Sequence, residues 1–162
     1  MWFNKHNPAV LYVDKREVPE MRCCDGRKFT ISPDILADFR NLPFPDKHFK
    51  LVVWDPPHLI HGGDKAYMVV KYGKLPNDWE TVLHDGFAEC MRVLDDYGTL
   101  IFKWNETQIL TSSVIRAIGH EPLFGHISGR KSNTHWMTFM KFPNKEAFDG
   151  QAHVPSPDDP SP

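Results

Sequence analysis

Four short apolar runs organise the first two thirds of the chain. They span residues 9–13, 35–37, 50–54 and 99–102. Runs of this length with little polar alternation are typical of parallel strands buried on both faces. The first three runs end directly in Asp14, Asp38 and Asp55. Because ligands bind beyond the carboxyl ends of the strands in open α/β sheets, we expect these carboxylates to line one rim.

Helical periodicity begins in the second half of the chain. Apolar residues recur at helical spacing from Trp79 to Leu94, after a helix-start signal at Pro76-Asn77-Asp78. A second helix is predicted from a cap at Asn105 to a stop at Gly119. Residues 121–127 and 134–142 then indicate two neighbouring closing strands. The pattern predicts an α/β fold, a doubly wound and mostly parallel sheet with an antiparallel terminal strand.

The remaining segments are polar. Residues 29–31 predict a small strand, and the long glycine-containing loop from Leu59 to Gly73 favours a substrate-covering role. From residue 144 onward, Pro, Asp, Ser and Gln without periodicity cannot bury enough apolar surface to order themselves. We therefore expect one domain over residues 1–143 and a disordered tail over residues 144–162.

Composition limits the classes of protein to which this chain could belong. Hydrophobic residues make up 41% and charged residues 25% of the 162 residues, as in ordinary globular domains. A formal charge of −2 argues against a strongly basic nucleic-acid surface but leaves room for a local basic patch. Three cysteines form no disulfide framework, and their spacing predicts no zinc or other metal site. With neither a membrane span nor a signal-peptide pattern, we expect a cytoplasmic protein.

The most informative motif is Asp55-Pro56-Pro57-His58, which follows the apolar run that ends at Trp54. The two prolines fix φ and contribute no backbone N–H, so carboxylate and carbonyl oxygens can face a ligand. His58 adds a flat aromatic ring. Acceptors beside an aromatic face suit the recognition of an exocyclic amino group on a base. The alternative is a strand-ending turn without chemistry.

This order of motifs resembles the Rossmann-like class I S-adenosylmethionine-dependent methyltransferases. More narrowly, it is similar to the small methyltransferases of bacteria and their phages that are often labelled DNA methylases. The resemblance runs from Trp2 to Phe142. Its supporting segments are WFNK at 2–5, ILADFRNLPF at 35–44, VVWDPPHL at 52–59, HDGFAECMRV at 84–93 and GTLIFKW at 98–104.

The resemblance implies S-adenosyl-L-methionine as the cofactor and gives several residues a role. Asp14 would accept hydrogen bonds from the cofactor ribose, while Asp38 and Phe39 would meet its adenine. Asp55, Pro56, Pro57 and His58 would form the catalytic corner that holds the target nitrogen beside the cofactor methyl group, with Asp55 also touching the cofactor. These residues then constitute the predicted cofactor-binding and catalytic set.

Lys103 and Asn105 follow the run at residues 99–102, so we expect them on the same rim. There they would contact the substrate or close the cofactor pocket, and the alternative is a plain strand end and helix cap. His61, Lys65, Lys71 and Lys74 in the long loop could meet phosphates, as could Arg130 and Lys131, although a solvated surface position is the favoured interpretation for any single one.

The family places a glycine-containing first strand and loop before the segment at residues 2–5, and the printed sequence does not include them. We therefore expect a sheet that lacks its first strand. Such a sheet would expose an edge or pair with another chain, allowing self-association.

The resulting expectation is methyl transfer to an exocyclic amino nitrogen, adenine N6 or cytosine N4, with DNA favoured over RNA as the partner. A protein glutamine stays open as an acceptor. Two alternatives remain: a catalytically silent interaction protein with the same fold, and an enzyme that consumes S-adenosylmethionine without a macromolecular acceptor.

Overall fold

The computed structural model describes residues 3–4, 6–22, 26, 28–63, 66–127 and 133–143. The predicted tail at 144–162 and the basic stretch at 128–132 lie outside these residues. Within them, no helix is long and apolar enough to cross a membrane.

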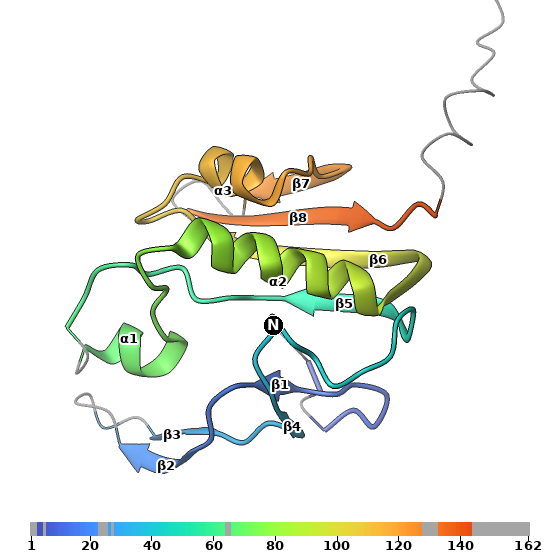
Figure 1. The fold of residues 1–162 in the computed structure, drawn as a ribbon. Coiled ribbons are helices and arrows are strands. Elements are labelled where there is room, and N and C mark those ends of the chain that lie inside the picture. Colours follow the sequence, from blue (N-terminus) through green and yellow to red (C-terminus); the bar gives the residue numbers. More distant parts are fainter. Residues whose placement is uncertain are drawn as a thin grey trace, which may run out of the picture.

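A four-stranded sheet with the order β5-β6-β8-β7 forms the centre of the fold (Figure 1). β5 and β6 are parallel, whereas β6–β8 and β8–β7 are antiparallel. The last two strands of the chain are neighbours in this sheet, as predicted, and β8 runs antiparallel to both of its partners, β6 and β7. Its strands are β5 (Phe49–Trp54), β6 (Leu94–Asn105), β7 (Phe124–Ile127) and β8 (Thr134–Met140).

Two small strand pairs lie apart from this sheet. β1 pairs with β4 in parallel, and β2 pairs with β3 in antiparallel fashion. The predicted strand at residues 9–13 is wrong for most of its length, since only its last residue is in a strand and Leu11 is 50% exposed. The four strands are β1 (Val13–Asp14), β2 (Val18–Arg22), β3 (Lys28–Ile31) and β4 (Ile35–Leu36).

Three helices complete the described fold: α1 (Tyr67–Tyr72), α2 (Trp79–Val93) and α3 (Thr111–Ile118). α2 begins after Asp78, as predicted. Helix α1 interrupts the segment that was predicted to be a plain loop. α3 ends at Gly119, whose φ of 71° is readily adopted by glycine, and this end was also predicted.

The predicted helix cap at Asn105 is wrong, because α3 starts only after Leu110. The Asn105 side chain instead accepts a hydrogen bond from the Thr107 backbone N–H at 3.1 Å, forming a local turn.

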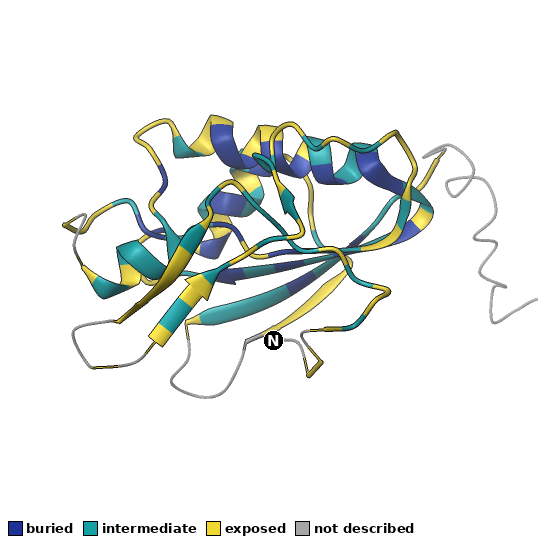
Figure 2. Ribbon diagram, turned by 90° about the horizontal axis from the view of Figure 1, so that it is seen from below, coloured by how far each residue is buried: buried dark blue, intermediate teal, exposed yellow. Residues whose placement is uncertain are grey.

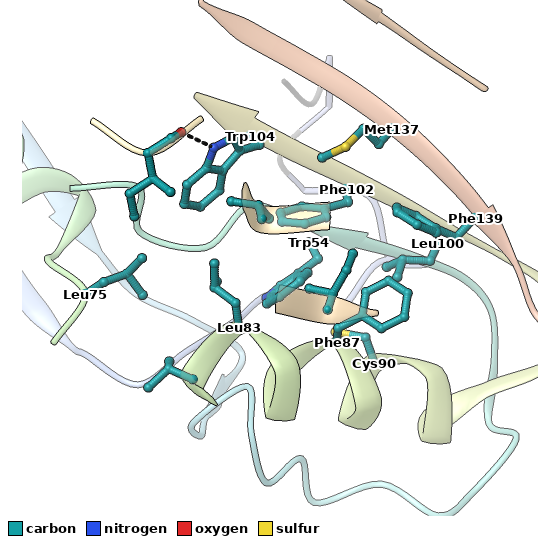
Figure 3. Close-up of a cluster of buried hydrophobic side chains, with 14 of the residues drawn as sticks. Trp54, Leu75, Leu83, Phe87, Cys90, Leu100, Phe102, Trp104, Met137 and Phe139 are labelled. Carbon is teal, nitrogen blue, oxygen red and sulfur yellow. Dashed lines mark hydrogen bonds between the residues drawn. The ribbon is translucent and has the colours of Figure 1, made fainter. Parts of the chain in front are cut away.

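The core lies between one face of the central sheet and α2 (Figure 1). Along β6, buried and less buried residues alternate, so Leu100, Phe102 and Trp104 point toward α2. Figure 3 shows these side chains meeting Leu83 and Phe87 from the helix. Figure 2 shows that the buried residues of α2 lie on one side of the helix only. The apolar periodicity of residues 79–94 is thus used for packing, as predicted.

Candidate functional site

A cavity of about 910 Å³ lies between the β1 segment and β5. The carboxyl ends of β1 and β5 meet at the same end of this cavity. A Cβ atom placed on Gly73 would lie 3.3 Å from Pro57 Cγ and 3.6 Å from Arg16 Nη1, so the residues that follow both strands converge there. β1 and β5 therefore point in the same direction, and Asp14 and Asp55 both line the cavity.

Asp55 is held by a cation from the next strand. Its Oδ2 accepts a hydrogen bond from Lys103 Nζ at 2.7 Å, and both side chains are about one third exposed (34% and 27%). Lys103 also lies 5.9 Å from the centre of the Trp136 ring. The pairing follows from the register, since Trp54 faces Phe102 and the next residues are therefore neighbours. Lys103 therefore forms an ion pair with Asp55 and does not face an open substrate space.

Pro56 and Pro57 line the cavity beside Asp55, but His58 is not among the lining residues. Its half-buried ring lies 5.8 Å from the Tyr72 ring and 6.5 Å from the Trp104 ring. Burial lowers the pKa of His58; the Asp55 charge opposes this and the Lys103 charge adds to it. The imidazole is consequently neutral at pH 7, and the Tyr72 ring beside it does line the cavity.

Asp14 lies at the opposite wall and is fixed by Arg16. Arg16 Nε and Nη2 donate to the two carboxylate oxygens at 3.1 Å each, and Arg16 also donates to the carbonyls of Val70 and Lys71. Arg16 therefore ties β1 to the end of α1. Sequence reasoning missed Arg16, although the Asp-x-Arg spacing at residues 14–16 was visible in the chain.

Asp38 repeats that spacing with a different outcome. Arg40 donates to both of its oxygens, at 3.0 and 2.9 Å, and this hydrogen bonding lowers the pKa of Asp38. Asp38 does not line the cavity, whereas its neighbour Phe39 does. The Phe39 ring packs edge-on against Trp54 with 5.6 Å between centroids. Of the three carboxylates predicted to line one rim, only Asp14 and Asp55 therefore line the cavity. Phe39 lies between the cavity and the core.

Asn105 lies away from this group, where its amide donates to Thr134 Oγ1 at 3.2 Å. Gln108 has a larger effect on the site. Its Oε1 accepts from the backbone N–H groups of Ile60 and His61 at 2.7 and 2.8 Å, and its Nε2 donates to the His61 carbonyl. Gln108 thereby fixes the segment after the Asp-Pro-Pro-His motif. No sequence signal pointed to this residue.

Charged residues gather at one end of the cavity, while its remaining wall is uncharged. The charged lining residues are Asp14, Lys15, Arg16, Asp55, Lys71 and Lys74. Lys71 Nζ lies 4.9 Å from the Tyr72 ring centre, and hydrogen bonding with Tyr72 and Tyr67 raises the pKa of Lys71. An apolar body with a polar end suits a small organic ligand that carries hydroxyls and a charge. In the described part of the chain, no cluster of three His, Cys, Asp or Glu could hold a metal ion.

Comparisons with known proteins add little. No family model matches the sequence, and no curated protein matches it. Among solved structures, the chain is similar to a SAM-dependent methyltransferase from Leishmania major, with a TM-score of 0.42 and 14% identity. The alignment covers 66% of this chain and 44% of that protein, so the chain spans less than half of its length.

Proposed function

We propose that residues 1–143 form a Rossmann-like, S-adenosylmethionine-dependent methyltransferase domain that methylates an exocyclic amino nitrogen, adenine N6 or cytosine N4, in DNA. One observation carries the proposal. The Asp55-Pro56-Pro57 turn lines a cavity of about 910 Å³ whose other wall carries Asp14 at the same end. A rigid turn rich in acceptors, next to a ligand-sized space, is the arrangement that amine recognition needs.

The residues of this cavity fit S-adenosyl-L-methionine. Arg16 holds the Asp14 carboxylate in place, and carboxylate oxygens keep further lone pairs that can accept hydrogen bonds from ribose hydroxyls. Phe39 and Tyr72 offer aromatic surface for the adenine and the sulfonium. The Asp55 carboxylate balances a positive sulfonium in the same space.

Asp55 has two separate tasks in the proposed reaction. Oδ2 stays with Lys103, which fixes the direction of the carboxylate, and Oδ1 accepts a hydrogen from the target amine. Pro56 and Pro57 contribute no competing N–H donor. When bound, S-adenosyl-L-methionine would supply an electrophilic methyl group, and Asp55 Oδ1 would hold the amine nitrogen toward it. The methylated nitrogen then loses a proton to water.

DNA is the proposed partner because cations surround the same end of the cavity. Lys15, Arg16, Lys71 and Lys74 line it there, next to the proposed amine site. A target base in a duplex has to be flipped out, or be single-stranded, to reach such a pocket. The flanking phosphates would then approach these cations.

A second candidate, a silent interaction protein of the same fold, is favoured by the ion pairs. Asp14, Asp38 and Asp55 are each already paired with a cation of the chain itself, at 3.1, 2.9 and 2.7 Å. A protein that never binds cofactor could keep such pairs for stability alone.

Calorimetry and methyl-transfer assays separate the two candidates. The purified chain is titrated with S-adenosylmethionine and then incubated with radiolabelled cofactor and unmethylated DNA, RNA or protein. We expect saturable binding and transfer to DNA, with N6-methyladenine or N4-methylcytosine identified by mass spectrometry of the digested product. Binding without transfer to any acceptor would favour an enzyme that consumes the cofactor alone.

Matched variants locate the activity. Asp55→Ala should abolish transfer, and Asp14→Ala should weaken cofactor binding at least tenfold. Asp85→Ala, which removes an exposed carboxylate that contacts His84 on α2 and does not line the cavity, should leave both unchanged. If the chain binds no cofactor, or if Asp55→Ala transfers methyl groups at the normal rate, the proposal is wrong.

A further inference from the structure

The carboxyl end of β6 contacts the motif Asp55-Pro56-Pro57-His58 at two points. Lys103 Nζ donates a hydrogen bond to Asp55 Oδ2 at 2.7 Å. The ring of the next residue, Trp104, lies at 84° to the His58 ring, with 6.5 Å between the two centroids. Trp104 is fully buried, so this end of the strand is a firm support. The first and the last residue of the motif therefore both lie against β6.

The turn that follows β6 extends this support. Trp104 Nε1 donates to the Ile109 carbonyl at 3.0 Å (Figure 3), and Ile109 is itself buried, so the turn is fixed to the core. Asn105 Oδ1 accepts a hydrogen bond from the Thr107 backbone N–H at 3.1 Å, which closes the turn. Gln108 lies between these two anchors. Its backbone is therefore held in place although the residue is exposed.

The Gln108 amide holds the two peptide groups that follow Leu59. Its Oε1 accepts from the N–H groups of Ile60 and His61 at 2.7 and 2.8 Å, and its Nε2 donates to the His61 carbonyl at 3.1 Å. Three hydrogen bonds from one planar amide fix both the position and the orientation of this backbone. The Leu59 carbonyl accepts from the Leu75 N–H at 2.7 Å, so the same segment is also tied to the chain after α1.

Two consecutive prolines make the motif stiff but dependent on its ends. Pro56 and Pro57 have a fixed φ and no N–H, so neither can donate a backbone hydrogen bond that would hold the turn in place. Because a stiff turn moves as a unit, a shift at one end is carried to the acceptors beside the cavity. Lys103 fixes the first end through Asp55, and Gln108 fixes the chain just past the other end.

We propose that Gln108 is a positioning residue for methyl transfer, which sets the place of the Asp55-Pro56-Pro57-His58 turn relative to the target amine. The inference rests on the proposed function. Gln108 does not line the cavity, so it acts through the backbone of Ile60 and His61. These bonds are exposed, and water can replace them without unfolding the protein. A displacement of about 1 Å at a reacting group can lower a rate about a hundredfold.

Two variants of the 162-residue protein test the role of the amide. Gln108→Leu removes all three hydrogen bonds at nearly the same size, whereas Gln108→Glu keeps an oxygen that accepts from both N–H groups. Gln108→Leu should lower kcat for methyl transfer to DNA about tenfold to a hundredfold, with the Kd for S-adenosylmethionine and the melting temperature unchanged. Gln108→Glu should restore most of the lost turnover. Thr81→Leu, at an exposed position of α2 outside the cavity lining, should match the unmodified protein throughout.

Hydrogen exchange resolved by NMR measures the effect on the backbone without requiring methyl transfer. In Gln108→Leu, the amides of Ile60 and His61 should exchange about tenfold faster than in the unmodified protein, and in Gln108→Glu they should stay protected. Amides in the middle of β6, which is paired on both sides, should exchange equally in all four proteins.

The results distinguish failure of this inference from failure of the proposed function. Absence of transfer by the unmodified protein to DNA, RNA and protein overturns both. Transfer by the unmodified protein, with equal turnover in Gln108→Leu or unchanged exchange of its Ile60 and His61 amides, overturns the inference alone. A loss of turnover in Gln108→Leu that comes with a lower melting temperature or weaker cofactor binding shows a merely structural role and overturns it too. So does an equal loss of turnover in Gln108→Glu.

Discussion

Replacing Gly86 by alanine tests the packing that joins α2 to the wall of the cavity. A Cβ atom at this position would lie 2.5 Å from two ring carbons of Phe39 and 2.8 Å from Trp54 Cζ2. Carbon atoms in contact normally stay about 3.5 to 4.0 Å apart. The Phe39 and Trp54 rings would therefore have to move by about 1 Å to make room.

Two opposing terms set the size of the effect. Overpacking of a well-packed region costs about 1 to 3 kcal/mol. Alanine stabilises a helix relative to glycine by about 1 kcal/mol. We expect Gly86→Ala to lower the free energy of unfolding by about 1 kcal/mol. Thr81→Ala, at an exposed position of the same helix, lacks the clash and should raise it by about 0.5 kcal/mol.

Urea denaturation followed by tryptophan fluorescence and circular dichroism measures these changes. A double-mutant cycle with Phe39→Ala isolates the contact, because removing the ring removes the two atoms that lie nearest to the new methyl group. In the Phe39→Ala background, Gly86→Ala should be neutral or stabilising, which gives a coupling energy of about 1 to 2 kcal/mol.

The opposite pattern would refute this reasoning. If Gly86→Ala raises stability by the full helix propensity in the unmodified protein, the Phe39 ring does not lie against α2. Phe39 would then be free to turn toward a ligand in the cavity. Additive effects of the two substitutions would lead to the same conclusion.

Three further outcomes follow from the structure. Burial lowers the pKa of His58 from 6.5. Its contribution to the free energy of unfolding is therefore present above pH 6.5 and is lost as the pH falls through 6.5 toward the pKa of the folded state. His58→Gln should make the free energy of unfolding, measured with urea, depend less on pH between 7.5 and 5.5. Burial raises the pKa of Cys90 to about 12, so iodoacetamide at pH 8 should label Cys90 about a thousandfold more slowly in the native than in the unfolded chain, as read by mass spectrometry. Arg92 donates to the carbonyls of Leu42 and Phe44, and Arg92→Lys should cost about 1 to 3 kcal/mol in urea denaturation because lysine lacks the planar fork. A flat response in the wild type, rapid native labelling or an unchanged midpoint would contradict these three outcomes in turn.

Strong periodicity made part of the fold predictable. The helix from Trp79 onward and its apolar side follow from spacing alone, and the run before Asp55 does form a strand. The run at residues 9–13 failed because a strand also needs a neighbour, and apolar composition does not reveal whether one is present. Only Val13 and Asp14 find a partner there, in β4.

Helix α1 shows why local sequence was insufficient. Tyr67–Tyr72 includes two adjacent valines, Val69 and Val70, which are weak helix formers, between glycine-containing segments. The helix end is held by Arg16, which donates to the carbonyls of Val70 and Lys71 across more than fifty positions of sequence. A contact over that distance cannot be found by scanning a window of residues.

The position of Asp55 at the end of a strand was predictable, but its electrostatic partner was not. The sequence motif led to Asp55 at the end of β5, and the cavity lies there. Lys103 was assigned to the same rim, yet its pairing with Asp55 depends on the register between β5 and β6, which no motif encodes. Since Lys103 offsets much of the Asp55 charge, attraction for a sulfonium would come less from net charge than from a carboxylate locked in direction. A site built in this way would select its amine by the geometry of hydrogen-bond acceptance, which is what a turn with two consecutive prolines can hold constant.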